Sequence, residues 1–398
     1  MMLVLLMIAA IVFPFSVAAT NVALGGTLGV GVLSGAWWEG VVSMWRRYRW
    51  FCVAAVAYWG LMILGLIWSS DRAWGMHVLG RQWYWLLVPL VMLLLANETW
   101  RPRFLGLLSL SLAAHLLFCV LQIFGYVTGT TAGGSTINDA TGHIGHIGFG
   151  VVYGMWTGFL LQWGQRHTGW YRIMAWLLAG WAVVMVFLAQ GRSGYLVVLV
   201  MLSVLFWKKM VVGRDWRVAA MVAGLLLLVG ALVIGLGPAK KRILDTERSA
   251  EMAMQGDVHH AEYRWSLWLA AWYAWREHPL LGIGTGGFPQ ASVWAKKHHP
   301  ELDYGSPVAA HPHNMYLLAL ARCGVPGLVA LLVFFGIWIR MGWCEEWERS
   351  DAGALIALSG IALAVHGLSA PSLEEHFEDI LAVLLLGTGL SYRQKRVA

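Results

Sequence analysis

Charged residues are scarce in this sequence: Asp, Glu, Lys and Arg make up 12% of its 398 residues, about half the share found in soluble globular domains. Hydrophobic residues make up 59%, and the mean hydropathy is +0.64. Because a soluble surface needs many more charges than this, the composition excludes a soluble globular fold. It predicts an all-α, polytopic integral membrane protein without a large soluble domain.

Several sequence signatures of cofactor and metal sites are also missing. The four cysteines show no CxxC spacing, which excludes a disulfide framework and a zinc ribbon. The chain has no GxxxxGK[ST] loop, no HExxH motif and no DxD pair for a metal-bound nucleotide sugar. We therefore expect neither a cofactor nor a metal ion.

Long apolar stretches occupy most of the chain, and reading them along the sequence gives about twelve candidate transmembrane segments. They are residues 3–19, 22–36, 51–68, 77–96, 104–127, 143–163, 173–188, 195–207, 216–236, 314–339, 352–370 and 377–390. The first stretch ends in small residues, as a secretion signal does, but no Lys or Arg precedes it. We therefore predict a retained span.

The positive charges are distributed unevenly between the linkers. Most linkers after even-numbered segments are rich in Lys and Arg, whereas the short linkers after odd-numbered segments contain only Arg72 and Arg192. The positive-inside rule then places both termini in the cytoplasm. The net charge of +7 is explained by this topology, so we expect no nucleic-acid partner.

One linker is much longer than the rest and divides the chain into three parts. Residues 1–236 would form the first nine spans, residues 237–313 a periplasmic segment carrying the catalytic residues, and residues 314–398 the last three spans and a cytoplasmic tail. The long segment opens with a basic stretch at residues 238–242, which we expect to contact the membrane surface. Polar residues concentrated in one loop on an apolar scaffold favour a functional site there.

Three features of the long segment could carry chemistry. An aromatic-rich helix is predicted over residues 261–275, with Tyr263 and Arg264 in its first turn and its apolar side in the lipid. Residues 278–288 contain a GxGxxG spacing, but a helix rather than a strand precedes it. A tight turn that approaches a neighbouring helix or an anion is therefore expected instead of a nucleotide site.

The third feature is the sequence His311-Pro312-His313-Asn314, which runs directly into the tenth span. An imidazole in this position suits proton transfer, because its unperturbed pKa is near 6.5. A histidine that merely caps the helix is the structural alternative. A surface ion pair is the corresponding alternative for Arg264, and an interface anchor is the alternative for Arg192 in the short turn before the eighth span.

Together, Arg192, Arg264 and His313 provide two guanidinium groups and one base on the outer face of the membrane. Guanidinium groups bind phosphate through paired hydrogen bonds. Such a set suits a lipid diphosphate whose glycan is transferred to an acceptor hydroxyl, with the departing diphosphate as the driving force.

At these residues the chain resembles the O-antigen ligase family, within the superfamily that includes O-antigen polymerases and O-oligosaccharyltransferases. The resemblance lies in the Gly191-Arg192-Ser193-Gly194 turn, in Arg264, in the run from His278 to Gly284, and in the pattern H[NSQ]x9Gxx[GTY]. That pattern is matched by His313 and Asn314 followed by Gly324 and Gly327.

The resemblance implies an enzyme of the bacterial inner membrane, with its active site facing the periplasm, acting in lipopolysaccharide biosynthesis. Its glycan donor would be linked to undecaprenyl diphosphate, its acceptor would be the lipid A core, and the transfer would be inverting and metal-independent. Arg192 and Arg264 would bind the diphosphate, and His313 would act as the base. Arg322, Asn314, Tyr263 and His311 are further expected substrate contacts, in a protein surrounded by membrane lipids.

Three alternatives remain from the sequence. A polymerase and an O-oligosaccharyltransferase would use the same lipid-linked donor with another acceptor. A lipid-linked oligosaccharide flippase would need charges at the middle of the membrane, whereas here they gather at the outer ends.

A further acidic run at residues 374–379 is predicted to be solvated.

Overall fold

The computed structural model describes residues 1–128, 139–189, 191–208, 210, 216–235, 244–245, 247–248, 251–252, 263–303, 308–345, 347 and 349–392. Within these residues the fold is all-helical and contains no β-strand, as the composition predicted. The basic stretch at residues 238–242 lies outside the described residues.

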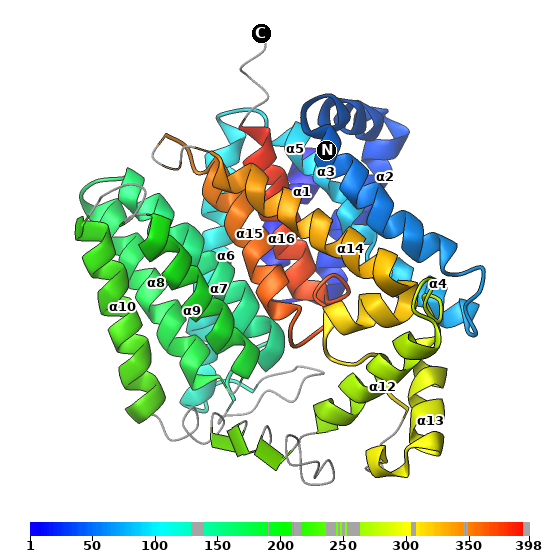
Figure 1. Ribbon diagram of the computed structural model, residues 1–398. Coiled ribbons are helices and arrows are strands. Elements are labelled where there is room, and N and C mark those ends of the chain that lie inside the picture. The colour runs from blue at the N-terminus through cyan, green and yellow to red at the C-terminus, as the bar shows by residue number, and fades with distance from the viewer. Residues whose placement is uncertain are drawn as a thin grey trace.

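The helices are numbered in chain order and labelled in Figure 1. They are α1 (Met2–Val12), α2 (Val17–Leu33), α3 (Ala36–Leu64), α4 (Arg72–Arg81), η1 (Trp83–Leu87), α5 (Val88–Leu94), α6 (Trp100–Ile123), α7 (His146–Arg166), α8 (Trp170–Leu188), α9 (Arg192–Trp207), α10 (Trp216–Gly235), α12 (Tyr263–Glu277), α13 (Phe288–His298), η3 (Pro300–Leu302), α14 (Met315–Trp343), α15 (Ala352–His366) and α16 (His376–Ser391).

Membrane-spanning character is clear for part of this bundle. Among the described residues, three helices are long and apolar enough to cross a bilayer, namely α6, α8 and α14. The pair α2 and α3 passes the same test as one span, bent by 86°. Shorter apolar helices, such as α9 and α15, lie among them. The chain therefore has the features of a membrane protein, with three or four spans evident from helix length and composition.

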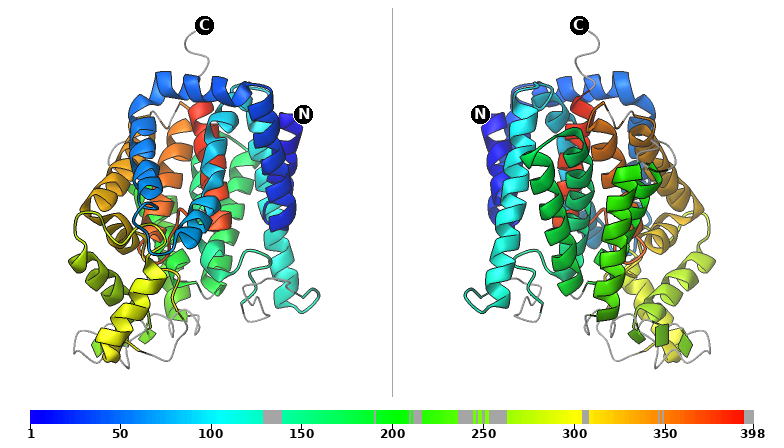
Figure 2. Two further views of the ribbon diagram at one scale, coloured as in Figure 1. Left: turned by 90° about the vertical axis from the view of Figure 1, so that its right-hand side faces the viewer. Right: turned by 90° about the vertical axis from the view of Figure 1, so that its left-hand side faces the viewer.

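The N-terminal helices differ from the predicted segments. The stretch 3–19 is broken because Pro14 cannot donate a backbone hydrogen bond and Ser16 caps α2, its side chain accepting from the Ala19 amide at 3.2 Å. Residues 37–50, expected as a linker, instead lie in α3, which changes direction at Tyr48 (φ −129°, ψ 38°). Figure 2 shows the first part of α3 lying across one end of the bundle. The stretch 77–96 is likewise divided, into α4, η1 and α5.

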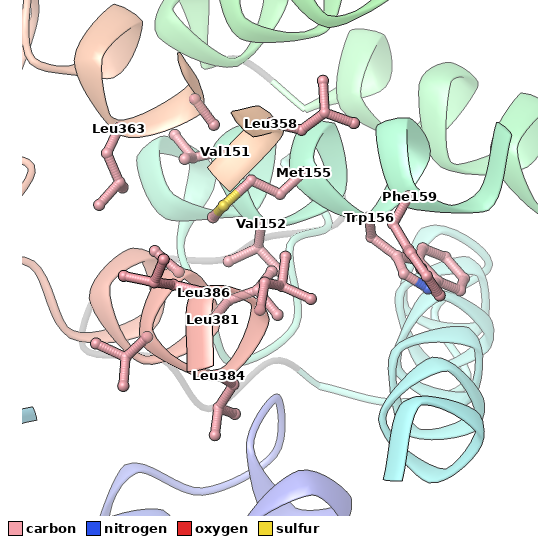
Figure 3. Close-up of a cluster of buried hydrophobic side chains, with 14 of the residues drawn as sticks. Val151, Val152, Met155, Trp156, Phe159, Leu358, Leu363, Leu381, Leu384 and Leu386 are labelled. Carbon is pink, nitrogen blue, oxygen red and sulfur yellow. The ribbon is translucent and has the colours of Figure 1, made fainter. Parts of the chain in front are cut away.

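The core is built around α7, which packs against α8, α9 and α15. Figure 3 shows Val151, Val152 and Met155 of α7 beside leucines of α15 and α16. Helices α7 and α9 approach closely because Gly150 and Gly194 face each other. A Cβ atom on Gly150 would lie 2.2 Å from the Cα of Gly194. This contact fixes where α9 begins, and with it the position of Arg192.

The two ends of the bundle carry different parts of the chain. Figures 1 and 2 show α1 beginning and α16 ending at one end, and α12 and α13 at the opposite end. Helix α12 buries Leu267, Ala271 and Ala274 against residues of α13 and α14. The expectation that its apolar side faces lipid is therefore wrong for this face, which packs against protein.

A break in α14 holds the turn at residues 278–287 in place. Gly324 has φ 64° and ψ −160°, a conformation that is essentially restricted to glycine. The carbonyl groups of Ala321 and Arg322 accept from the amides of Ile283 and Gly284, both at 2.9 Å, and the Val325 amide donates to the Pro279 carbonyl at 3.0 Å. The turn thus supplies hydrogen bonds that the broken helix lacks.

Replacing Gly324 with alanine is expected to destabilise the protein by about 2 kcal/mol or more. The new Cβ would lie 2.4 Å from the Leu280 carbonyl oxygen, and alanine does not adopt this backbone conformation readily. Thermal unfolding of the solubilised protein measures the effect. Gly336→Ala on the same helix is the matched control, because its Cβ meets nothing within 4 Å. Equal unfolding temperatures for the two variants would contradict the requirement for glycine at position 324.

Candidate active site

The start of α14 presents His313 in an unusual backbone conformation. His313 has φ 51°, and no other described residue except glycine has a positive φ. Asn314 caps the helix, as its side-chain oxygen accepts from the amides of Tyr316 and Leu317 at 3.0 Å each. Its Nδ2 donates to the Leu368 carbonyl at 3.2 Å, so both polar groups of the Asn314 side chain hold the helix start against the end of α15.

His311 and His313 form a compact pair beside cationic groups. Their rings lie 4.4 Å apart at 74°, and the His313 amide donates to His311 Nδ1 at 3.3 Å. Burial, followed by the neighbouring positive charge of Arg264, lowers the pKa of His313. Burial, together with His313, Arg322, Arg81 and Arg264, lowers the pKa of His311 to about 3. Both imidazoles are therefore mainly neutral at pH 7.

Arg264 is the cation of this cluster that has no carboxylate partner among the residues the structure describes. It sits half-buried in the first turn of α12, and burial lowers the pKa of its guanidinium group. A partly desolvated guanidinium beside two neutral imidazoles attracts an anion. Arg264 lies close enough to His313 for its positive charge to act on the imidazole.

Arg322, by contrast, is neutralised within the fold. It is 2% exposed and forms a buried ion pair with Glu374, in which Nη2 lies 3.4 Å from Oε2. Arg81 pairs with Glu375 at 3.6 Å.

The prediction that the acidic run 374–379 is solvated is wrong, because Glu374, Glu378 and Asp379 are all buried. The partner of Glu374 comes from a distant helix, α14, which local sequence does not reveal.

Removing one charge of the Arg322–Glu374 pair is expected to lower the stability of the folded protein strongly. Glu374→Gln leaves the Arg322 guanidinium buried without its counter-charge, which should destabilise the protein by about 3–5 kcal/mol. The double variant Arg322→Met/Glu374→Met removes both charges and should recover most of the loss. Thermal unfolding of the three proteins measures this, and a double variant no more stable than Glu374→Gln would contradict the pairing.

Arg192 begins α9 at the same end of the bundle. A Cβ on Gly191 would lie 2.3 Å from the His146 carbonyl oxygen, so the start of α9 abuts the start of α7. Two residues further along α7, Gly148 faces the carboxylate of Glu378 in the first turn of α16. These contacts place the start of α9 beside α7, with the first turn of α16 next to it, whereas Arg264 and His313 interact electrostatically.

The glycine turn contacts helices rather than presenting its amides to a ligand. Besides the bonds to α14, the Thr285 amide donates to the Gly65 carbonyl at 3.3 Å and the Gly286 amide donates to Ser69 Oγ at 2.9 Å. Of the two roles left open for this turn, close approach to neighbouring helices is the one observed. Tyr263 is the first residue of α12.

In the described part of the chain, no three His, Cys, Asp or Glu side chains are arranged to hold a metal ion. Beside His313 lie instead the His311 imidazole and the Arg264 guanidinium. The arrangement can bind an anion and can accept a proton.

A comparison with curated proteins gives no match. The family model for O-antigen ligase, in contrast, matches residues 173–332. This range contains Arg192, Arg264 and His313, the glycine turn, and the break in α14 at Gly324. This match supports the resemblance to the O-antigen ligase superfamily that these motifs indicated.

Proposed function

We propose that this protein is an O-antigen ligase, which transfers a glycan from undecaprenyl diphosphate to a sugar of the lipid A core. The observation that carries the proposal is the half-buried Arg264 guanidinium beside the neutral His313 imidazole at the start of α14. Both residues lie in the part of the chain that matches the O-antigen ligase family.

The chemistry follows from the charges of the cluster. Arg264 and Arg192 bind the diphosphate and stabilise the negative charge that grows on it as the bond between the anomeric carbon and the phosphate oxygen breaks. An acceptor hydroxyl attacks the anomeric carbon from the opposite face, which inverts its configuration. The proton of that hydroxyl passes to His313. His311 and Tyr263 would contact the substrates. Asn314 and Arg322, whose side chains are already paired within the fold, would hold the shape of the site.

The alternative role for His313 is that of a positively charged imidazolium that binds the phosphate. Its lowered pKa favours the base, because a group that is neutral at pH 7 can accept a proton and carries no positive charge. The reaction needs no metal in this scheme, since the arginines supply the positive charge.

The proposal also includes a transmembrane topology for the chain. About twelve segments would cross the inner membrane, with both termini in the cytoplasm. Residues 1–236 would form the first part, residues 237–313 the catalytic periplasmic segment, and residues 314–398 the rest. The positions of α12 and α13, opposite the end where α1 begins, support this arrangement (Figure 2).

A gene deletion in the organism that carries this chain tests the proposal against its sister activities. Loss of ligation should leave a lipid A core without O-antigen, while full-length glycan accumulates on the polyprenyl carrier. A core bearing a single repeat unit would instead identify a polymerase. Loss of glycan from proteins alone would identify an O-oligosaccharyltransferase, and accumulation of cytoplasm-facing donor would identify a flippase.

A further inference from the structure

A groove of about 590 Å³ lies at the same end of the molecule as the active site but does not include it. The last turn of α12, the glycine turn, α13 and the segment 68–70 after α3 form its walls. The residues used below are Trp68, Ser70, Glu277, His278, Gln290 and Trp294. Arg264, His311, His313 and Arg322 do not line it.

The groove and the active site share one structural wall. The amides of Ile283 and Gly284 donate to α14 at Ala321 and Arg322, while Leu281, Gly282 and Ile283 also line the groove. Helix α12 runs from Arg264 to Ala274 on the groove wall, which at 1.5 Å per residue is about 15 Å. A chain of a few linked sugars can extend over this distance from the reacting hydroxyl.

The lining of the groove suits an oligosaccharide. Trp68 and Trp294 are 37% and 36% exposed, so parts of their rings are available to the apolar faces of sugars. Ser70, Glu277, His278 and Gln290 offer donors and acceptors for sugar hydroxyl groups. A mostly apolar cleft with a few polar groups is typical of small-ligand sites.

The two tryptophans are held in place before any ligand binds. Trp68 Nε1 donates to the Leu281 carbonyl at 3.2 Å, and Trp294 stacks on His298 with ring centres 4.5 Å apart. Side chains ordered in advance lose less entropy on binding. This arrangement favours a dedicated binding surface over a chance depression.

The position of the groove indicates that it binds the acceptor rather than the donor glycan. Leu281, which lines the groove, is 62% exposed, and the preceding Leu280 is 70% exposed. Exposed leucines next to a tryptophan are typical of the membrane surface. An acceptor that is itself a lipid keeps its sugars at this level, whereas a long donor glycan extends away from the membrane. We propose that this groove binds the sugars of the lipid-anchored acceptor; the inference rests on the proposed function.

Transfer kinetics with varied acceptor test the inference. Trp294→Ala and Gln290→Ala should each raise KM for lipid A core about tenfold, equivalent to about 1.4 kcal/mol, and leave kcat within about twofold. Such a split indicates loss of binding that is equal in the ground state and the transition state. Trp272→Ala is the matched control, since Trp272 is 43% exposed on α12 but does not line the groove.

A binding measurement separates this inference from the proposed function. Saturation-transfer NMR with deacylated core oligosaccharide and the full-length protein in nanodiscs requires no turnover. Weaker binding to Trp294→Ala than to the parent supports the groove even if no transfer is observed. An unchanged KM for core in both variants, or a rise in KM for the donor alone, overturns the inference while leaving the ligase activity intact.

Discussion

Replacing His313 with asparagine is expected to lower the rate of glycan transfer by about 10²–10⁴-fold, the usual contribution of a general base. Asparagine is the informative substitution because His313 has φ 51°, and asparagine adopts this left-handed conformation more readily than most residues. The variant thus keeps the backbone and a polar side chain but cannot take a proton at neutral pH.

The control for this variant is His77→Ala. His77 is exposed on α4, at the same end of the bundle, and stacks on Trp74 outside the cluster. Its replacement should leave the transfer rate unchanged. Activity in His313→Asn equal to that of the control would exclude His313 from the chemistry.

The pH dependence distinguishes the two roles proposed for His313. A base must be unprotonated, and burial beside Arg264 lowers its pKa below the usual 6.5. The value of kcat/KM should therefore be flat near pH 7 and fall only as the pH drops below about 6.5. A loss of activity on the alkaline side of that pKa, with retention below it, would indicate a phosphate-binding imidazolium instead.

Arg264→Gln should lower the transfer rate by about 10²–10³-fold, the cost of removing one group that stabilises developing negative charge. Arg264 is placed for this role because it is half-buried beside His313 and has no carboxylate partner among the described residues. Arg264→Lys should restore part of the rate, since lysine keeps the charge but not the paired hydrogen bonds to phosphate.

Arg276→Gln is the matched control for Arg264→Gln, because Arg276 is exposed in the last turn of the same helix. Steady-state kinetics with varied donor measure the effect. If Arg264→Gln affects only acceptor KM, or behaves like Arg276→Gln, then Arg264 does not bind the diphosphate.

Local patterns were sufficient to predict several of these features. The aromatic run 261–275 corresponds to α12 (Tyr263–Glu277), and residues 261 and 262 lie outside the described part. Asn314 marks the start of α14 because its side chain is a good N-cap. The glycine turn was recognisable because its positive φ angles, 67° at Gly282 and 82° at Gly284, favour glycine.

Non-local pairing could not be predicted in the same way. Glu374 stands in an acidic run before a helix, which locally resembles a solvated N-terminus, yet its partner Arg322 is 52 residues away in sequence. The one available signal was Arg322 itself, since an arginine inside an apolar span needs a counter-charge. Similarly, the break between α1 and α2 follows from Pro14 and Ser16, whose effect the continuous hydropathy of residues 3–19 concealed.

The most direct test of the central claim is glycan transfer by the purified protein. Undecaprenyl-diphosphate glycan and lipid A core are supplied together with EDTA, and the parent is compared with His313→Asn and Arg264→Gln. The account predicts transfer to the core that survives chelation in the parent and is lost in both variants. Growth of the glycan on its polyprenyl carrier, or equal transfer by all three proteins, would contradict it.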